Sequence, residues 1–239
     1  MKLLEITREE VKGKIGVMPI GSVEQHGPHL PMGTDSIVAE WLASQLESKY
    51  GDEVVLFPPL TYGCSWEHGR QPFVGISYVT MINFLTELME SARNAGLLSM
   101  ILVNGHGGNE SVLDVVRRQV NFRNRGFKVY LFSMVGRDRG LFQGVDMHAG
   151  SVETSRMLFL RRELVRLEKI SEVKDLSVKE GVFQTITTEE ANLHGVINLG
   201  GRIEVDASKG ETSMMRALRE LEELFLKVRE KVNEVHKEQ

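Results

Sequence analysis

Residues 14–35 read Lys-Ile-Gly-Val-Met-Pro-Ile-Gly-Ser-Val-Glu-Gln-His-Gly-Pro-His-Leu-Pro-Met-Gly-Thr-Asp, a short apolar run followed by a polar loop. The apolar run is typical of a buried strand. The loop after it gathers four side chains of the kinds that bind metals: Glu24, His26, His29 and Asp35. In an extended chain Glu24 and His26 leave the backbone on the same side and can share one site. The glycines and prolines that follow must turn the chain, so Asp35, at the start of a predicted helix, can return to that place.

Strand and helix patterns alternate along the rest of the chain. Strands are predicted over Lys14–Ile20, Val54–Leu60, Leu97–Val103 and Phe127–Met134, and helices over Asp35–Tyr50, Thr80–Asn94, Asn109–Asn124, from about Ser151, and over Asp206–Lys237. Apolar strands that alternate with helices indicate an α/β fold with a mainly parallel sheet covered on both faces. The glycine-rich segment Val173–Ile203 predicts loops or a short hairpin. We expect residues 1–239 to form a single domain.

Composition narrows the classes of function. The chain has 239 residues, 41% of them hydrophobic, and a net charge of −4, so nothing indicates binding to nucleic acid or to an anionic membrane. The N-terminus lacks the apolar core of a signal peptide, and no run approaches the roughly 20 apolar residues of a membrane span, so we expect a cytoplasmic protein. Cys64 is the single cysteine. Any metal must therefore be held by histidines and carboxylates.

Polar motifs follow each predicted strand. Ser65, Glu67 and His68 follow the second predicted strand, and His106 follows the third in a Gly-rich turn. The segment Asp146–Ser155, which contains His148 and Glu153, follows the fourth strand. Because ligands of open parallel sheets bind beyond the carboxyl ends of the strands, these loops should share one site. The loops carry all the histidines except His194 and His236.

Structural alternatives stay open for several of these residues. Asp35 can cap a helix, and the helix dipole favours an acid such as Glu153 in a first turn. An isolated loop histidine such as His148 is ordinarily a surface residue. Asn104–Asn109 lacks the Lys-Ser/Thr ending of a phosphate-binding loop and the order of a dinucleotide-binding turn, so phosphate binding there is disfavoured.

Three motifs together resemble those of the creatininase family, the creatinine amidohydrolases and their relatives. The motifs are Gly-Ser-Val-Glu-Gln-His-Gly-Pro-His-Leu-Pro at 21–31 with Thr34-Asp35, Asn-Gly-His-Gly-Gly-Asn at 104–109, and His-Ala-Gly-Ser-Val-Glu-Thr-Ser at 148–155. The resemblance implies a three-layer α/β/α sandwich, two divalent metal ions and a homo-oligomer, a hexamer or a dimer.

The resemblance also implies roles for individual residues. Glu24 and His26 would bind different ions, Asp35 would bridge both, and His106 would complete one coordination sphere. His148 would match the catalytic histidine of the family.

Two glycines depart from the family pattern. Creatininase has a glutamate ligand where this chain has Gly108, so the second ion needs another ligand, for which Glu153 is our candidate. Creatininase also has a tyrosine in place of Gly107, which counts against creatinine itself as the substrate.

These residue types suit amide hydrolysis. Two divalent cations carry four positive charges, and Glu24, Asp35 and Glu153 supply three negative ones, so one hydroxide makes the site neutral. The ions would lower the pKa of bound water from about 15.7 towards 7. His148, with an ordinary pKa of about 6.5, is predicted to be the general acid, assisted by Glu67 or His68. Mixed histidine and carboxylate ligands suit Zn, Mn or Fe(II).

We expect a hydrolase that cleaves a non-peptide amide or formamide C–N bond in a small molecule. The chain looks most similar to the archaeal family members that deformylate 2-amino-5-formylamino-6-ribosylaminopyrimidin-4(3H)-one 5'-monophosphate, a step towards riboflavin and deazaflavin cofactors. Predicted substrate contacts are Ser65, His68, Asn109 and Arg70, and a phosphate could bind Arg70, Arg137 or Arg139. The alternatives are a creatininase-type cyclic amide hydrolase, a peptide-trimming hydrolase, and a small-molecule-binding module with a structural metal.

Overall fold

A parallel four-stranded sheet forms the centre of the computed structural model, which describes residues 1–138, 140–174, 176, 188–199 and 201–237. The strands lie in the order β2-β1-β3-β4. They are β1 Ile15–Ile20, β2 Val54–Leu56, β3 Ser99–Asn104 and β4 Lys128–Ser133. β1 pairs with β3 from Ile15 opposite Ser99 to Ile20 opposite Asn104, so the two strands end side by side. This common end is where the polar loops begin.

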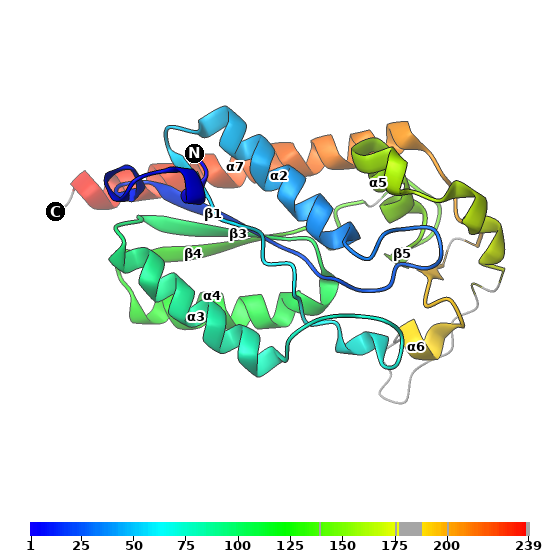
Figure 1. The fold of residues 1–239 in the computed structure, drawn as a ribbon. Coiled ribbons are helices and arrows are strands. Elements are labelled where there is room, and N and C mark those ends of the chain that lie inside the picture. The colour runs from blue at the N-terminus through cyan, green and yellow to red at the C-terminus, as the bar shows by residue number, and fades with distance from the viewer. Residues whose placement is uncertain (139, 175, 177–187, 200, 238–239) are drawn as a thin grey trace.

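Helices cover both faces of the sheet (Figure 1). One face carries α2 Thr34–Tyr50 and α7 Ala207–Lys237, and the other carries α3 Tyr78–Asn94 and α4 Glu110–Arg123. α5 Ser151–Arg161 packs against α7 beyond the end of the sheet. The predicted three-layer α/β/α arrangement with a mainly parallel sheet is therefore confirmed.

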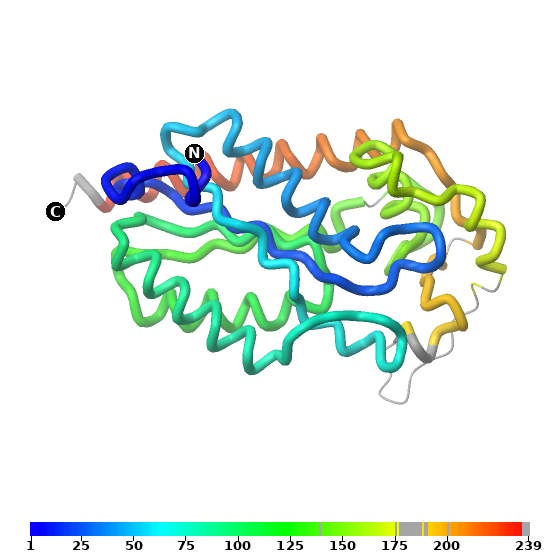
Figure 2. Tube along the Cα trace, in the orientation of Figure 1, coloured from blue at the N-terminus to red at the C-terminus, as the bar shows by residue number. Residues whose placement is uncertain are grey.

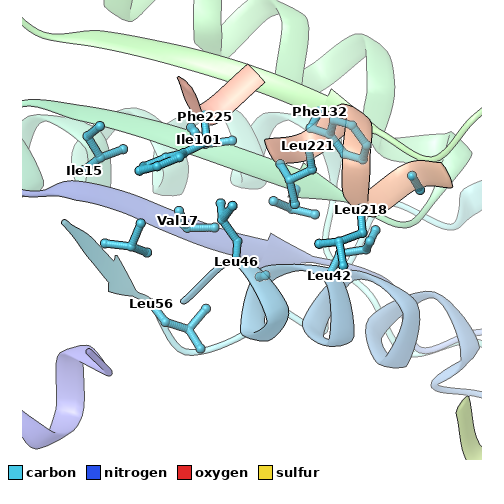
Figure 3. Packing of buried hydrophobic residues seen from close by; sticks show 14 of the residues in the cluster. Ile15, Val17, Leu42, Leu46, Leu56, Ile101, Phe132, Leu218, Leu221 and Phe225 are labelled. Carbon is cyan, nitrogen blue, oxygen red and sulfur yellow. The ribbon is translucent and has the colours of Figure 1, made fainter. Parts of the chain in front are cut away.

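The central strands are apolar throughout because both of their faces are buried. Ile15 and Val17 of β1 point towards α2 and α7, whereas Met18 and Ile20 point towards α3 and α4. Figure 3 shows Val17 among Leu42 and other side chains of the first of these layers. Burying each such side chain contributes about 1.5–3 kcal/mol. The sheet is thus a rigid base for the loops at its edge.

Local chemistry accounts for the small differences from the predicted elements. β2 ends at Leu56, before Pro58 and Pro59, although Leu60 still forms an isolated parallel bridge with Ile20. α3 begins at Tyr78, two residues earlier than predicted, because the Ser77 side chain accepts the backbone N–H of Thr80. A short helix, α1 Arg8–Val11, was not predicted.

The segment Val173–Ile203 does not form a local hairpin in its described part. It contains α6 Thr188–Ala191 and β6 Ile197–Asn198, and β6 pairs antiparallel with β5 Asp146–His148 from a distant part of the chain. The prediction of loops or a short hairpin is therefore not tested as a whole, because residues 175, 177–187 and 200 lie outside the described residues and the partner of β6 lies outside the segment. This pairing brings the segment to the edge where the polar motifs lie.

The strand order places a switch in chain direction between β1 and β3. The chain leaves β1 towards β2 on one side and leaves β3 towards β4 on the other, so the loops after β1 and β3 diverge and leave a crevice. Figure 2 shows the loops gathered at this end, with the two termini towards the opposite end. No helix in the described part of the chain is long and apolar enough to cross a membrane.

Candidate metal centre

A cavity of about 110 Å³ lies at this edge of the sheet. It is lined by residues of all four predicted loops and of the segment that contains α6 and β6. The lining residues are Glu24, Asp35, Glu67, His68, His106, Gly107, Gly108, Met147, His148, Glu153, Thr188 and Ile197. The structure therefore brings together most of the residues that the sequence singled out.

Backbone pairing holds the loop after β1 in place. The N–H of Gln25 donates to the carbonyl of Pro72 at 2.8 Å, and the N–H of Val74 donates to Val23 at 2.8 Å. Between these bonds, Glu24 turns its side chain inward and is only 1% exposed, and His26 is equally buried. The loop of Glu24 is thereby tied to the loop that carries His68.

Asp35 lies in the first turn of α2 between two histidines. Its Oδ1 is 3.3 Å from His26 Nε2, and its Oδ2 is 3.1 Å from His106 Nδ1. A Cβ on Gly105 would lie 2.2 Å from the Asp35 carbonyl oxygen, so only glycine allows the turn after β3 to come this close. Each carboxylate oxygen thus faces a different imidazole, as a carboxylate that bridges two ions requires.

Two further carboxylates complete the cluster. Glu24 Oε1 is 3.3 Å from His106 Nδ1, and Glu153 Oε2 is 3.6 Å from His26 Nε2. Asp146 holds the first turn of α5, which carries Glu153, by accepting the N–H groups of Gly150, Val152 and Glu153. The carboxylate of Glu153 also accepts the N–H of Ala149 at 2.6 Å, and Ala149 has a left-handed backbone with φ of 53°. The turn before α5 therefore aims Glu153 at His26.

Three histidines present one nitrogen to the cluster and anchor the other on a backbone carbonyl. His26 Nδ1 bonds to the Glu24 carbonyl at 3.0 Å, His106 Nε2 to the Cys64 carbonyl at 3.0 Å, and His148 Nε2 to the Gln25 carbonyl at 2.7 Å. Because a carbonyl only accepts, the proton of each neutral ring is on the anchored nitrogen. In the neutral ring that binds a metal ion, the other nitrogen carries a lone pair towards the carboxylates, which is the arrangement of metal-binding histidines.

The buried polar atoms of the cluster fit divalent cations. Both carboxylate oxygens of Glu24, His26 Nε2, Asp35 Oδ2 and His68 Nε2 have no hydrogen-bond partner within the described residues. Burying such atoms unpaired is costly, and a bound cation removes that cost. Three sets of ligand atoms lie close enough to share an ion: Glu24, Asp35 and His106; His26, His148 and Glu153; and Glu24, His68 and His148.

The electrostatics separate the roles of these groups in the metal-free protein. Burial works to raise the pKa of the Glu24 carboxyl, but the nearby His106 holds it well below its usual range. Burial, together with Asp146 and Asp35, raises the pKa of Glu153 to about 8. Burial and the neighbouring His26 lower the pKa of His148 to about 3. His148 is therefore neutral near pH 7, with its lone pair on Nδ1.

Three residues predicted to contact substrate lie outside the cavity lining. Ser65 is fully buried and hydrogen-bonds to Ser22, and Asn109 is buried with its side chain bonded to Cys64 N and Gly21 O. Arg70 is exposed. These placements favour a structural role for Ser65 and Asn109 over the predicted substrate contact.

The remaining predicted residues are divided between the cavity and its surroundings. His29 is buried outside the lining, with Nε2 2.9 Å from Thr154 Oγ1. Arg137 pairs with Glu220, and Arg139 lies outside the described residues. Glu67 and His68 both line the cavity.

Sequence reasoning missed the residues that support the cluster from other segments. Thr188 bonds to His68, and Asp146 caps α5. Asp146 lies in β5, four residues before the N-cap Gly150, so the local capping pattern does not identify it. No local pattern marks Thr188.

The fold and the buried set of imidazole and carboxylate ligands define the class of the protein: a metal-binding α/β protein whose centre lies at the carboxyl edge of a parallel sheet. The model of the creatininase family, described as creatinine amidohydrolase, matches residues 1–225, and the chain belongs to this family.

Similar proteins agree with this assignment. The mycofactocin precursor peptide peptidase of Mycobacterium ulcerans is 33% identical over 168 residues, which cover 65% of this chain and 62% of that protein. The 2-amino-5-formylamino-6-ribosylaminopyrimidin-4(3H)-one 5'-monophosphate deformylase of Methanococcus maripaludis is 31% identical over 116 residues, 47% of this chain and 50% of that protein. A solved structure described as Creatininase Mn shares the fold with a TM-score of 0.76 at 20% identity, over 91% of this chain and 94% of that one.

Proposed function

We propose that the protein is a metal-dependent amidohydrolase that cleaves a non-peptide amide or formamide C–N bond. The observation that carries this proposal is the position of Asp35, whose two buried oxygens face His26 and His106 separately. Two divalent cations bridged by a carboxylate lower the pKa of a bound water to about 7 and polarise a carbonyl oxygen. The site thus supplies what amide hydrolysis needs.

The ligands divide into two sets that share Asp35. Glu24 and His106 complete one set, and His26 and Glu153 complete the other. Glu153 takes the place of the glutamate that is absent at Gly108. Zn, Mn or Fe(II) suit these nitrogen and oxygen ligands.

His148 is the proposed group for proton transfer. Its neutral ring directs Nδ1 into the cavity, so it accepts a proton from the attacking water and then returns it to the departing nitrogen. The sequence predicted a general acid. The lowered pKa supports a base that becomes the acid only after the first transfer.

Glu67 is the second proposed catalytic residue. Its side chain is 29% exposed, and Oε1 lies 3.1 Å from His106 Nε2 at the wall of the cavity. A carboxylate in this position can accept a hydrogen bond from the N–H of the scissile amide. It therefore orients the leaving nitrogen.

For the substrate, we propose a formamide on a small molecule, with the formylamino-pyrimidine phosphate as the specific candidate. The similarity to the Methanococcus maripaludis deformylase supports it. Peptide trimming is the second candidate, because the Mycobacterium ulcerans peptidase is similar over a longer part of the chain.

The test is to load the purified protein with Zn, Mn or Fe(II) and to measure three products in parallel. Formate released from the formylamino-pyrimidine phosphate is the expected result. Shortened peptide without formate would favour the second candidate, and creatine formed from creatinine would favour a creatininase-type activity. Fewer than one bound ion per chain in protein purified without chelator would refute the metal-dependent mechanism. We also propose a homo-oligomer, which light scattering tests.

A further inference from the structure

His68 faces the carboxylate of Glu24 deep in the protein. The ring is fully buried, and its Nε2 lies 3.1 Å from Glu24 Oε1. Neither atom has a hydrogen-bond partner within the described residues. His148 Nδ1 lies 3.7 Å from the same oxygen, and the rings of His68 and His148 are 4.8 Å apart. Three buried ligand atoms therefore converge on one point.

The other ring nitrogen of His68 faces Thr188 and Gln25. Thr188 Oγ1 lies 2.7 Å from His68 Nδ1 and 3.3 Å from the Glu67 carbonyl, and Gln25 Nε2 lies 3.2 Å both from His68 Nδ1 and from the Gly195 carbonyl. In the tautomer with the proton on Nδ1, the Thr188 hydroxyl accepts that proton and donates to the Glu67 carbonyl, while Gln25 donates to Gly195. This tautomer leaves the lone pair of His68 on Nε2, directed at Glu24, and is the one that binds a cation.

In this tautomer of His68 the three converging atoms are all acceptors. His148 likewise holds its proton on Nε2, against the Gln25 carbonyl, and presents a lone pair on Nδ1. Two imidazole lone pairs and a carboxylate oxygen in a buried position repel one another unless a cation lies between them. Two imidazoles and one carboxylate are a ligand set that Zn²⁺ takes readily.

We propose that Glu24, His68 and His148 form a third position for a divalent cation, beside the two that share Asp35. The proposal rests on the proposed function, since Glu24 is shared with one of those ions. A cation there occupies the Nδ1 lone pair of His148, which proton transfer requires. The third position is therefore inhibitory. It fills after the other two, because Glu24 is already neutralised by the neighbouring ion.

The test is a zinc titration of metal-free protein against a chromophoric chelator, with bound zinc measured by mass spectrometry. Wild-type protein is expected to bind two equivalents tightly and a third more weakly, whereas His68→Ala binds two. Thr188→Val is expected to lower the affinity for the third zinc ion by about 10-fold or more, because the variant loses the partner that orients the ligand His68.

Matched controls show whether the loss is specific. His194→Ala removes a histidine outside the cavity lining, and Thr86→Val removes a buried hydroxyl that accepts a bond from Gln119. Both controls should retain three equivalents. Excess zinc should slow formamide hydrolysis by wild-type protein, and His68→Ala should need about 10-fold more zinc for the same fractional loss.

The outcomes separate this proposal from the proposed function. Two equivalents in both wild-type protein and His68→Ala, or a third equivalent that persists in His68→Ala, overturns the third position alone. Equal inhibition of the two proteins by zinc overturns its inhibitory role. Zinc bound at no position in wild-type protein overturns the metal centre and the third position together.

Discussion

Replacing Gly108 by alanine tests whether the turn after β3 is packed as tightly as the metal centre requires. A Cβ there would lie 2.4 Å from the Cys64 carbonyl oxygen, 2.5 Å from His106 Nε2 and 2.7 Å from Glu67 Oε1. The added methyl group must therefore separate His106 from Cys64, whose hydrogen bond holds the ring. The effect should reach metal binding through the orientation of His106.

The magnitude follows from two terms. Forcing a methyl group into a packed site costs about 1–3 kcal/mol of folding free energy, and leaving a buried donor unpaired costs about 1–3 kcal/mol more. We expect urea unfolding of the metal-free protein to show a loss of about 2–6 kcal/mol. Losing the partner that orients a ligand should weaken metal binding about 10- to 100-fold, measured by competition with a chelator.

Gly107 provides the matched control one residue away. A Cβ at Gly107 would meet only Val135 Cγ2, at 3.8 Å, which is an ordinary contact. Gly107→Ala should therefore keep its metal affinity and should unfold with unchanged or slightly higher free energy, by about 0.4–1 kcal/mol at most. If Gly108→Ala matched Gly107→Ala in both stability and metal affinity, the packing argument for His106 would be refuted.

Four further substitutions probe other residues in and beside the centre. Asp35→Asn should lose both tightly bound ions, and Glu153→Gln should lose only one, as measured by mass spectrometry. Retention of both ions in Asp35→Asn would contradict the proposal that Asp35 bridges them. His148→Ala should keep the two tightly bound ions while turnover falls by about 10²- to 10⁴-fold, and loss of either ion would make His148 one of their ligands. Burial and the charge of His26 lower the pKa of His29 from 6.5 to about 4. As pH falls, His29 is therefore protonated in the unfolded chain before it is protonated in the folded protein. The metal-free protein should consequently lose stability as pH falls from about 6.5 to 4. The loss should be on the order of 3 kcal/mol in urea unfolding and smaller in His29→Gln; equal pH slopes in the two proteins would exclude His29 as the cause.

Much of the fold and part of the centre could be predicted because the relevant information is local. The apolar run Ile15–Ile20 predicts a buried strand, and the loop after it carries three of the proposed ligands within a short stretch: Glu24, His26 and Asp35. The rule that ligands bind beyond the carboxyl ends of parallel strands then brought His106 and Glu153 to the same place. The structure shows these side chains within a few ångströms of one another.

Contacts between distant segments could not be predicted in the same way. Thr188 meets His68 across 120 positions of sequence, and β6 meets β5 across about fifty. Such pairs leave no periodic pattern, because each partner is an ordinary residue of its own segment. The placement of His68 as a candidate ligand depends on these contacts, which is why the sequence supported only a substrate contact or an assisting catalytic role for it.

The size and charge of the cavity bear on the choice of substrate. A volume of about 110 Å³ is well below the roughly 300–1,000 Å³ of pockets that enclose a whole ligand, so the described cavity has room for a small reacting group and not for a whole ligand. No Lys or Arg is among the described residues that line it, so this lining offers a phosphate no cationic side chain.

The cavity lining also includes an exposed apolar side chain. Met147 lines the cavity and is 52% exposed, and the Tyr78 hydroxyl lies close enough to Glu67 for burial and that charge to raise its pKa. A flat or apolar group of the substrate can rest there while a small carbonyl reaches the floor. This geometry supports the proposed cleavage of a formyl group, or of another small terminal amide, from a larger molecule.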